Sequence, residues 1–332
     1  MIRVAVDAMG GDHAPEEIVA GAAAAASDEI EPILFGRVGV ETLGLRFVEA
    51  DATIEMDDPA VEAVRSKPGS SLVRAVRAVA DGNAEAVVSA GNTGAMLAAS
   101  LLHIRRLPGV RPGIAAVIPT KRGPSVLIDA GANAEARPEH LVQFAHMGAL
   151  LAEEILGIAA PQIRLLSIGE EREKGSQLVL DAHELLRESS LAFAGNTEGR
   201  ALLEGEADVV VSDGFTGNVA LKTIEGTVSS LLELLRAEIE ASTRGKLGGL
   251  LVRPAARRIR ERLDPDTYGG AYLLGLNGLV VIAHGSSSRV AIANAIRLAA
   301  RGVGHRVVER LQERLSPGVL ASARSTTPTA ER

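Results

Sequence analysis

The sequence contains no cysteine and no tryptophan, and aromatic residues make up only 2% of its 332 residues. Without cysteine, the chain can form no disulfide, no thiolate zinc site and no cysteine nucleophile. Nucleic-acid binding by base stacking is disfavoured because so few aromatic side chains are present. These absences exclude several functional classes, and we expect no nucleic acid among the partners.

Long apolar runs are also absent. No stretch is apolar over the ~18 residues that a membrane-spanning helix needs. Met1 leads directly into a strand-like run at 2–7, which leaves no room for a signal peptide. The sequence therefore predicts a cytoplasmic protein. Its net charge of −7 argues against general binding to polyanions, although this average conceals a basic segment around residue 250.

Familiar cofactor and catalytic motifs are missing as well. The first strand is not followed by Gly-x-Gly-x-x-Gly, and the chain has neither a nucleotide P-loop nor a Gly-x-Ser-x-Gly elbow. His183-Glu184 lacks the second histidine of a zinc-binding helix. We expect no cofactor and no metal. A metal-dependent hydroxyacid dehydrogenase stays a minor alternative, since Asp7, Asp129 and Asp213 at strand ends could bind Mg²⁺.

Strand-like runs alternate with helical patterns along the chain. This predicts an α/β fold, a three-layer α/β/α sandwich around a mostly parallel sheet. No Pro/Gly/Ser-rich linker divides the chain, so we expect a single domain over 1–315 with a helical hairpin inserted at about 236–263. Residues 316–332 lack periodicity and are expected to be disordered. The expected strands lie at 2–8, 32–36, 46–50, 86–90, 114–119, 125–130, 163–168, 191–194, 208–212 and 279–283.

Glycine and asparagine gather where these strands are expected to end. Ligands of open α/β sheets bind outside the carboxyl ends of the strands. Glycine lets the backbone approach a ligand closely, and asparagine offers amide donors, so the two together suit an oxygen-rich ligand. We expect the loops to meet at one edge of the sheet and form a site there. The loops lie at 7–13, 89–94, 129–133, 169–175, 195–199 and 212–218.

Two of these loops lead directly from a strand into a helix. In the segment 207–226, a valine strand, a glycine loop and a helix follow without a spacer, and the helix N-terminus would favour an anion. The loop 89–94 has the same arrangement, so we expect phosphate or sulfate near Gly91, Asn92 and Thr93. The expected phosphate- and substrate-binding residues are Gly10, Gly11, Asp12, His13, Gly91, Asn92, Thr93, Gly94, Asn133, Asn196, Asp213, Gly214, Thr216 and Gly217.

Five separated motifs occur in a fixed order. They are Asp-Ala-Met-Gly-Gly-Asp-His-Ala-Pro at 7–15, Ser-Ala-Gly-Asn-Thr-Gly-Ala at 89–95, Ser-Asp-Gly-Phe-Thr-Gly-Asn-Val-Ala-Leu-Lys at 212–222, Tyr-Gly-Gly-Ala at 268–271 and Ala-His-Gly-Ser-Ser at 283–287. Together they resemble the acyl-(acyl carrier protein):phosphate acyltransferases of bacterial phospholipid synthesis, the PlsX family. The resemblance extends from Met1 to about Val308.

The resemblance implies transfer of a long-chain acyl group from acyl carrier protein to orthophosphate, giving acyl phosphate and free carrier. It also implies a homodimer and a fold similar to the isocitrate/isopropylmalate dehydrogenases and phosphotransacetylases. Family members associate peripherally with membranes and deliver acyl phosphate to a membrane glycerol-3-phosphate acyltransferase. One position departs from the family pattern, because Ser288 stands where an aspartate is expected. A serine therefore replaces the acid that the family pattern places near His284.

The chemistry needs no strong acid or base, because orthophosphate is already anionic at pH 7 and a thiolate leaves readily. Positioning and charge stabilisation should supply the rate. We hypothesise that Lys174 neutralises phosphate or the oxyanion, that Asn218 and the amides after Gly214 donate hydrogen bonds, and that His284 orients phosphate or protonates the thiolate. Alternatively, His284 only pins its own turn, and Lys174 pairs with Glu170, Glu171 or Glu173.

Two other functions stay open. A short-chain phosphotransacetylase acting on acyl-CoA would use the same chemistry, and a non-catalytic acyl- or anion-binding regulator could keep the same fold. The acyl length cannot be read from the sequence, because a tunnel lined by alanine, leucine and valine is indistinguishable from ordinary core.

A basic segment interrupts the acidic chain. Between Arg244 and Arg262, seven basic residues face one acid, a net charge of +6. The apolar run at 247–252 contains two glycines and predicts the turn of a hairpin, with Pro254 at the start of its second helix. Basic flanks around an apolar tip favour docking on anionic membrane and on the acidic carrier. Alternatively, the leucines pack against a dimer partner. The expected docking residues are Leu247, Leu250, Leu251, Arg253, Arg257 and Arg258.

Overall fold

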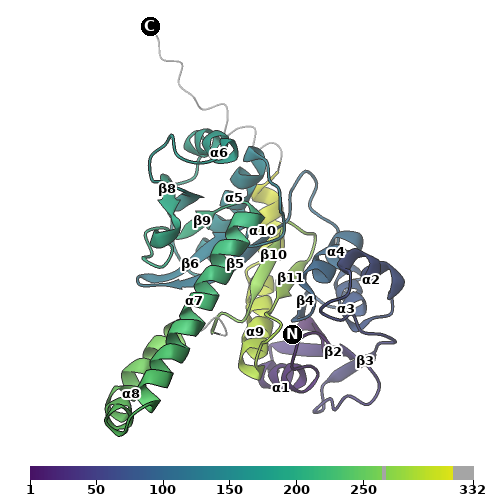
Figure 1. Ribbon diagram of the computed structural model, residues 1–332. Helices are drawn as coiled ribbons and strands as arrows, with labels where there is room; N and C mark the ends of the chain where they lie inside the picture. The colour runs from purple at the N-terminus through teal and green to yellow at the C-terminus, as the bar shows by residue number, and fades with distance from the viewer. Residues whose placement is uncertain (264–266, 317–332) are drawn as a thin grey trace.

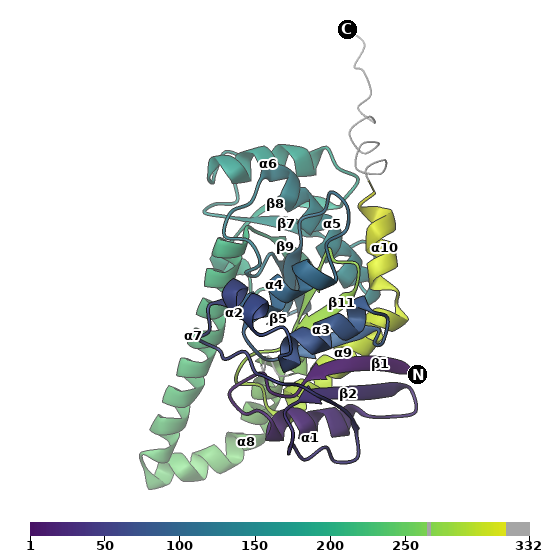
Figure 2. The same ribbon diagram turned by 90° about the vertical axis from the view of Figure 1, so that its right-hand side faces the viewer.

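The computed structural model describes residues 1–263 and 267–316, with the backbone alone at 259–263. Within these residues the chain forms one 11-stranded sheet with helices on both faces (Figures 1 and 2). The strands are β1 (Ile2–Asp7), β2 (Ile30–Gly36), β3 (Arg46–Glu49), β4 (Ala86–Ser89), β5 (Gly113–Thr120), β6 (Gly123–Ile128), β7 (Ile163–Ser167), β8 (Phe193–Glu198), β9 (Val209–Val211), β10 (Ala271–Leu274) and β11 (Leu279–Ile282).

The helices largely occupy the intervals between these strands. A disordered tail was expected at 316–332, and from residue 317 this segment lies outside the described residues. The helices are α1 (Glu16–Ala25), α2 (Ala60–Ser66), α3 (Ser71–Ala80), α4 (Thr93–His103), α5 (Pro138–Glu154), α6 (Gln177–Arg187), the 3₁₀ turn η1 (Gly199–Ala201), α7 (Gly214–Glu240), α8 (Thr243–Leu263), α9 (Arg289–Gly304) and α10 (Val307–Arg314).

The sheet order is β3-β2-β1-β4-β11-β10-β5-β6-β9-β7-β8. All neighbours from β3 to β11 are parallel, and so are all neighbours from β6 to β8. Between these two sets, β10 is antiparallel to both β11 and β5, and β5 is antiparallel to β6. The mostly parallel sheet predicted from the sequence is confirmed. The sequence reading missed β10, a four-residue strand that directly follows Tyr-Gly-Gly.

The three antiparallel pairings reverse the direction of one half of the sheet. The loops therefore do not share one edge, and that expectation was wrong. The last residue of β6, Ile128, pairs with Ala115, whereas Ala116 pairs with Ala271, which in turn pairs with Ile282 at the end of β11. The carboxyl ends of the two halves thus approach each other from opposite directions and converge beside β5.

Hydrophobic side chains cover both faces of the sheet. In β1, Val4 and Val6 belong to one cluster and Ala5 to another, as the alternation of side chains along a strand requires. The first cluster contains residues of α1, α5, α6, α9 and α10, and the second contains residues of α2, α3 and α4. A small third cluster contacts α7. The three-layer α/β/α arrangement predicted from the sequence is therefore present.

One buried histidine lies in this core, away from the strand ends. His146 on α5 is 3% exposed, and neither ring nitrogen has a hydrogen-bond partner among the described protein residues. Burial, together with the nearby Arg314, lowers the pKa of His146 to about 4. The charged imidazolium is thus disfavoured in the folded protein.

This histidine predicts a loss of stability in acid. The pKa is about 4 when folded and 6.5 in its ordinary state, so the unfolded chain binds the proton first as the pH falls through this window. The free energy of unfolding should therefore decrease by on the order of 3 kcal/mol as the pH falls between these two values. Urea unfolding at pH 7 and pH 4.5 measures the decrease, which His146→Leu should largely remove. An equal acid loss in the variant would contradict this assignment.

The long helix α7 leaves the body of the protein and pairs with α8 in a projecting hairpin (Figure 1). The connection lies at 241–242, so the turn predicted at 247–252 was wrong, as was the helix start at Pro254, which lies inside α8. Helix α8 begins directly after Ser242, which caps it: the Ser242 Oγ accepts a hydrogen bond from the Gly245 amide at 2.9 Å.

The glycines of this segment allow close packing instead of a turn. A Cβ on Gly249 would lie 2.6 Å from Ile239 Cγ2, and one on Gly245 would lie 2.4 Å from the Ile239 carbonyl oxygen. Both glycines therefore let α8 approach the end of α7. Among the helices of the described residues, none is long and apolar enough to cross a bilayer.

Candidate active site

A cavity of about 660 Å³ lies where the carboxyl ends of the two half-sheets converge. One end is polar and is lined by Asp12, Gly91, Thr93, Asn218, Lys222 and His284. The other end is mainly apolar and extends along α7 past Ile224, Val228 and Leu232, with Glu225 and Ser229 also in its lining. These are the proportions of a site for a ligand with a charged head and an apolar tail.

The loops after β1 and β4 are held together at the polar end. Asp7 is buried and accepts a hydrogen bond from Ser89 Oγ at 2.7 Å, and the Gly91 amide donates to the same hydroxyl at 3.0 Å. A Cβ on Gly10 would lie 2.7 Å from the Gly91 nitrogen, so only glycine permits this approach. Burial raises the pKa of Asp7. Its carboxyl therefore joins two loops beneath the cavity.

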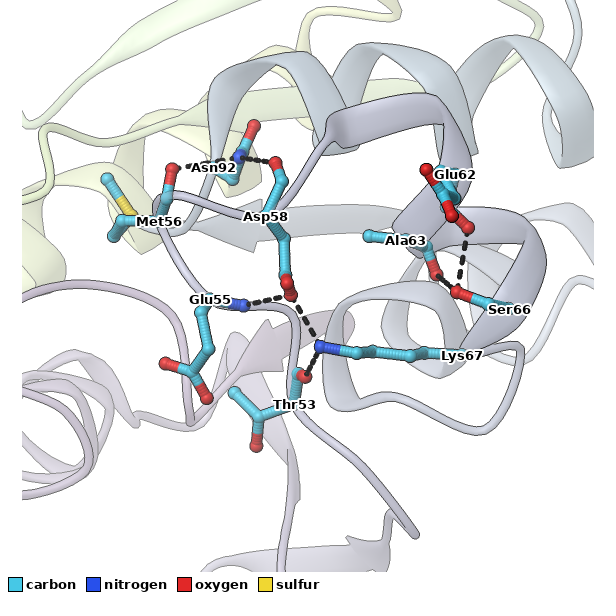
Figure 3. Close-up of polar contacts among 9 residues, drawn as sticks. All are labelled: Thr53, Glu55, Met56, Asp58, Glu62, Ala63, Ser66, Lys67 and Asn92. Atoms are coloured by element: carbon cyan, nitrogen blue, oxygen red, sulfur yellow. Dashed lines mark hydrogen bonds and ion pairs between the residues drawn. The ribbon is translucent and has the colours of Figure 1, made fainter.

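The amide side chain of Asn92 binds the backbone of neighbouring segments (Figure 3). Its Oδ1 accepts from the Ala95 amide at 3.0 Å and caps α4, while its Nδ2 donates to the carbonyls of Met56 at 3.0 Å and Asp58 at 3.1 Å. An asparagine has only two N–H donors, so none is left for phosphate. Only the backbone amides of this loop and the Thr93 hydroxyl could contact an anion.

The contacts of Asn92 fasten the loop 53–58 beside the cavity. Lys67 Nζ donates to Asp58 Oδ2 at 2.5 Å and to the Thr53 carbonyl at 3.1 Å, as Figure 3 shows. The loop carries Met56, whose Cε would lie 3.0 Å from a Cβ on Gly285. Met56 therefore closes the polar end on the side of the His284 loop.

On the opposite side, Asp129 organises the turn after β6. It accepts hydrogen bonds at 2.9–3.1 Å from the amides of residues 114, 131, 132 and 133, and a fifth from Asn133 Nδ2 at 2.8 Å. Burial raises the pKa of Asp129 despite these donors. Asn133 is buried and also donates to the Pro112 carbonyl. Both side chains face the turn and support it.

Helix α7 begins against this turn. A Cβ on Gly214 would lie 2.4 Å from the Asn133 carbonyl oxygen, and one on Gly217 would lie 2.0 Å from the Asp129 carbonyl oxygen. Asp213 caps the helix by accepting from the Thr216 amide at 2.9 Å and from its hydroxyl at 2.8 Å. The glycines thus place α7 so that Asn218 faces the cavity.

Asp7, Asp129 and Asp213 do not form a metal-binding cluster in the structure. Asp7 accepts from the Met9 amide and from Ser89, and the other two aspartates accept from their own turns. No group of three or more acidic or histidine side chains with the spacing of metal ligands occurs in the residues that the structure describes. The aspartates at the strand ends therefore give no support to the metal-dependent dehydrogenase alternative.

Lys222 and His284 meet at the polar end of the cavity. Lys222 Nζ lies 3.0 Å from His284 Nε2 and 2.8 Å from Glu225 Oε2, and His284 Nδ1 lies 2.8 Å from Ser286 Oγ. An ammonium group only donates, so Nε2 accepts in the contact with Lys222. On the other side of the ring, Nδ1 lies within hydrogen-bonding distance of both the hydroxyl and the backbone amide of Ser286, the amide at 3.3 Å.

Lys222 is the last residue of the motif at 212–222, but no role was predicted for it from the sequence. The available signal was its spacing, because residues four apart on a helix share a face, and Lys222 follows Asn218 by four. The position of His284, after β11, depends on the sheet order. Among the described ion pairs, Glu225 is the acidic partner of Lys222.

Lys174 does not line the cavity. It lies in the loop after β7, where its carbonyl accepts a hydrogen bond from Ser167 Oγ at 2.9 Å and its side chain packs over Gly169. In the described structure no ion pair joins Lys174 to Glu170, Glu171 or Glu173. Its role in the reaction stays a prediction.

Asn196 was expected in a loop, but it lies inside β8, where it is buried. Its Nδ2 donates to the Glu171 carbonyl at 2.9 Å, and its Oδ1 lies 3.0 Å from His183 Nδ1. The strand continues through Gly195, which takes a positive φ of 90°. Asn196 therefore supports the backbone of the loop that carries Lys174.

The remaining candidates lie around the polar end. Gly11 has a φ of 109°, and the Asp12 amide donates to the Gly285 carbonyl at 2.8 Å. His13 is exposed and does not line the cavity. Gly94 packs α4 against α2, because its Cβ would lie 2.9 Å from that of Ala60. Ser288 caps α9 by accepting from the Ala291 amide.

The sequence matches the family described as "Fatty acid synthesis protein" over residues 2–310. It is 48% identical over 330 residues to a phosphate acyltransferase of Heliobacterium modesticaldum, covering 96% of this chain and 98% of that protein. A phosphate acyltransferase of Thermosynechococcus vestitus is 47% identical over 325 residues, covering 93% and 94%.

Solved structures with a similar fold include a branched-chain phosphotransacylase from Enterococcus faecalis, with a TM-score of 0.60, 19% identity and coverage of 91% of this chain and 99% of that one. A phosphotransacetylase from Streptococcus pyogenes has a TM-score of 0.59 and 20% identity, covering 91% and 94%. These two confirm the expected phosphotransacetylase-like fold. The near-complete sequence matches confirm the resemblance carried by the five motifs, and the chain belongs to the PlsX family of phosphate acyltransferases.

Proposed function

We propose that this enzyme transfers a long-chain acyl group from acyl carrier protein to orthophosphate and so supplies acyl phosphate for phospholipid synthesis. Acyl transfer to phosphate follows from the family. The observation that supports a long-chain donor is the cavity, whose polar end holds Lys222 and His284 and whose apolar end extends along α7. A short acetyl group would use only the polar end.

The phosphate binds at the polar end in this mechanism. Lys222 neutralises its charge, Asn218 and the backbone amides near Gly91 donate hydrogen bonds, and His284 Nε2 faces the reacting group. The amides at the start of α7, after Gly214, were expected to donate as well. Gly214 itself is packed against the Asn133 turn, so Asn218 carries this role at the cavity wall.

The reaction proceeds through a tetrahedral intermediate. A phosphate oxygen forms a bond to the thioester carbonyl carbon, the carbonyl oxygen becomes the oxyanion, and its collapse breaks the C–S bond. The departing thiolate takes a proton from the phosphate, directly or through His284, which leaves acyl phosphate and the free carrier thiol. The sequence-based hypothesis gave the positive charge near the phosphate or oxyanion to Lys174, but Lys174 lies in the loop after β7 and does not line the cavity, so Lys222 supplies the charge in this mechanism. No acyl-enzyme forms.

The decisive assay mixes purified protein with palmitoyl acyl carrier protein, with and without phosphate. We expect phosphate-dependent loss of thioester and equimolar acyl phosphate. Acetyl-CoA serves as the comparison, since a short-chain phosphotransacetylase would react faster with it. Binding of either donor without any turnover would instead support the regulator. Crystals grown with phosphate or sulfate should place the ion near Gly91 and Thr93.

We further propose that the hairpin of α7 and α8 docks on anionic membrane and on the acidic carrier, while residues 1–315 otherwise form one domain on the cytoplasmic side. Leu247, Leu250 and Leu251 are 62%, 63% and 85% exposed, at helical spacing on α8. Arg253, Arg257 and Arg258 follow on the same helix and are also exposed. The product would pass to a membrane glycerol-3-phosphate acyltransferase.

Flotation with liposomes tests this docking. The protein should bind anionic vesicles at low salt, because each basic residue near such a surface contributes about 1 kcal/mol, and should bind neutral vesicles poorly. Leu250→Glu combined with Leu251→Glu should abolish binding. Unchanged binding by this double variant would favour the alternative, in which the leucines pack against a second protomer of the expected homodimer. Sedimentation of both proteins reports the oligomeric state directly.

A further inference from the structure

We infer that the acyl tail lies between β5 and α7 and that Val228 and Leu232 set the longest chain the enzyme accepts. This inference rests on the proposed function, since it concerns the tail of the proposed donor. The cavity is continuous from Lys222 at the polar end to Leu232 at the apolar end. A tail attached to a carbonyl near Lys222 therefore has one apolar direction to follow.

The wall on α7 is a single helical stripe. Leu221, Ile224, Val228 and Leu232 recur at intervals of three, four and four residues, and each is half-buried. The neighbours Thr227 and Leu231 are exposed and do not line the cavity. The stripe thus distinguishes the groove side of α7 from the rest of the helix.

The facing wall is a strand stripe. Ala116 and Ile118 of β5 are buried, and successive even-numbered residues lie on one face of a strand. Leu221 and Ile224 pack against the cluster that contains Ile118, which places this face of β5 opposite α7. Pro119 and Leu203 continue the wall beyond Ile118. Both walls are mainly apolar over the same length of groove, and the polar lining residues on α7, Glu225 and Ser229, lie next to the apolar stripe in the sequence.

The length of the groove matches a membrane lipid tail. From Lys222 to Leu232, ten residues of α helix rise about 15 Å. Half the hydrocarbon thickness of a bilayer, the space that one acyl tail fills, is also about 15 Å. Val228 lies about 9 Å along the helix and Leu232 at its far end, so an obstruction at each should exclude different chain lengths.

Bulky substitutions test the two positions. Val228→Trp should lower kcat/KM for palmitoyl acyl carrier protein by on the order of 10-fold or more. The value for butyryl acyl carrier protein should change little, because its four-carbon chain ends before Val228. Leu232→Trp should impair palmitoyl transfer more than octanoyl transfer, and Leu232→Ala should extend the range to longer chains. Thr227→Trp is the matched control, because threonine has nearly the shape of valine but faces solvent.

The outcomes separate this inference from the function on which it rests. If the wild-type protein transfers no acyl group to phosphate, the proposed function fails. If the wild-type protein is active but Val228→Trp lowers the rates of all donors equally while its thermal unfolding is unchanged, the tail lies elsewhere. An unchanged chain-length profile in all three groove variants would also overturn the inference.

Discussion

Lys222→Met is expected to lower kcat/KM for acyl transfer to phosphate by about 10²-fold or more. The side chain is the cation that lines the polar end beside His284, 3.0 Å from Nε2. A preorganised charge in a partly enclosed site stabilises the transition state more than it would in water, and methionine keeps the length of the side chain while removing the charge. Steady-state kinetics with varied phosphate measures the loss.

The matched comparison is Lys174→Met, because Lys174 was assigned this role from the sequence but does not line the cavity. Sequence reasoning predicts a loss on the order of 10²-fold for removal of Lys174 as well. Lys121, which is exposed, pairs with Glu204 and lies outside both the cavity and the hairpin, is the control for a general change of charge. If Lys222→Met stays within about twofold of wild type while Lys174→Met is inactive, the essential cation lies on the loop after β7 and the role given to Lys222 is wrong.

Gly217→Ala should inactivate the enzyme and weaken its fold. A Cβ at this position would lie 2.0 Å from the carbonyl oxygen of Asp129, which belongs to a buried turn that cannot move aside. Helix α7 must therefore shift, and it carries Asn218 and Lys222 with it. We expect a loss of about 1–3 kcal/mol of folding free energy and at least about 10²-fold in kcat, because displacements near 1 Å are enough for that.

Gly226→Ala on the same helix is the control. A Cβ there meets no atom within 4 Å among the described residues. Alanine favours the helix over glycine by roughly 0.5–1 kcal/mol, so this variant should be active and slightly more stable. Denaturant unfolding and kinetics of both variants decide the matter. Equal behaviour of the two would mean that the contact with Asp129 does not position α7.

The sequence alone was sufficient for the elements that depend on neighbours along the chain. Buried valine runs such as Val209–Val211 form strands, because β-branched side chains favour extended backbone, and this preference is read from the sequence without tertiary information. Asn92 and Asp213 follow strands and cap the helices that begin directly after them, as short polar side chains do. The five motifs then identified the family, because their order and composition are local properties too.

Other local signals were ambiguous. Gly249 suits a turn as well as a close helix contact, and only the position of Ile239 on the preceding helix favours the second. Asn92 and Asn196 each follow a glycine, yet Asn92 caps a helix beside the cavity and Asn196 lies inside a strand. A side chain's chemistry lists its possible partners, and the fold selects among them.

What only the tertiary structure decided is how the two halves of the sheet meet. Strand β10 is antiparallel to β11 and β5, and β5 is antiparallel to β6, so the carboxyl ends of β6 and β11 point toward each other. This arrangement brings Lys222 within 3.0 Å of His284, 62 residues away in the sequence. Strand order and direction depend on the packing energy of the whole sheet and not on any single segment. The sequence by itself therefore determined every described strand except β10, as well as the family, whereas the pairing that completes the polar end required the fold.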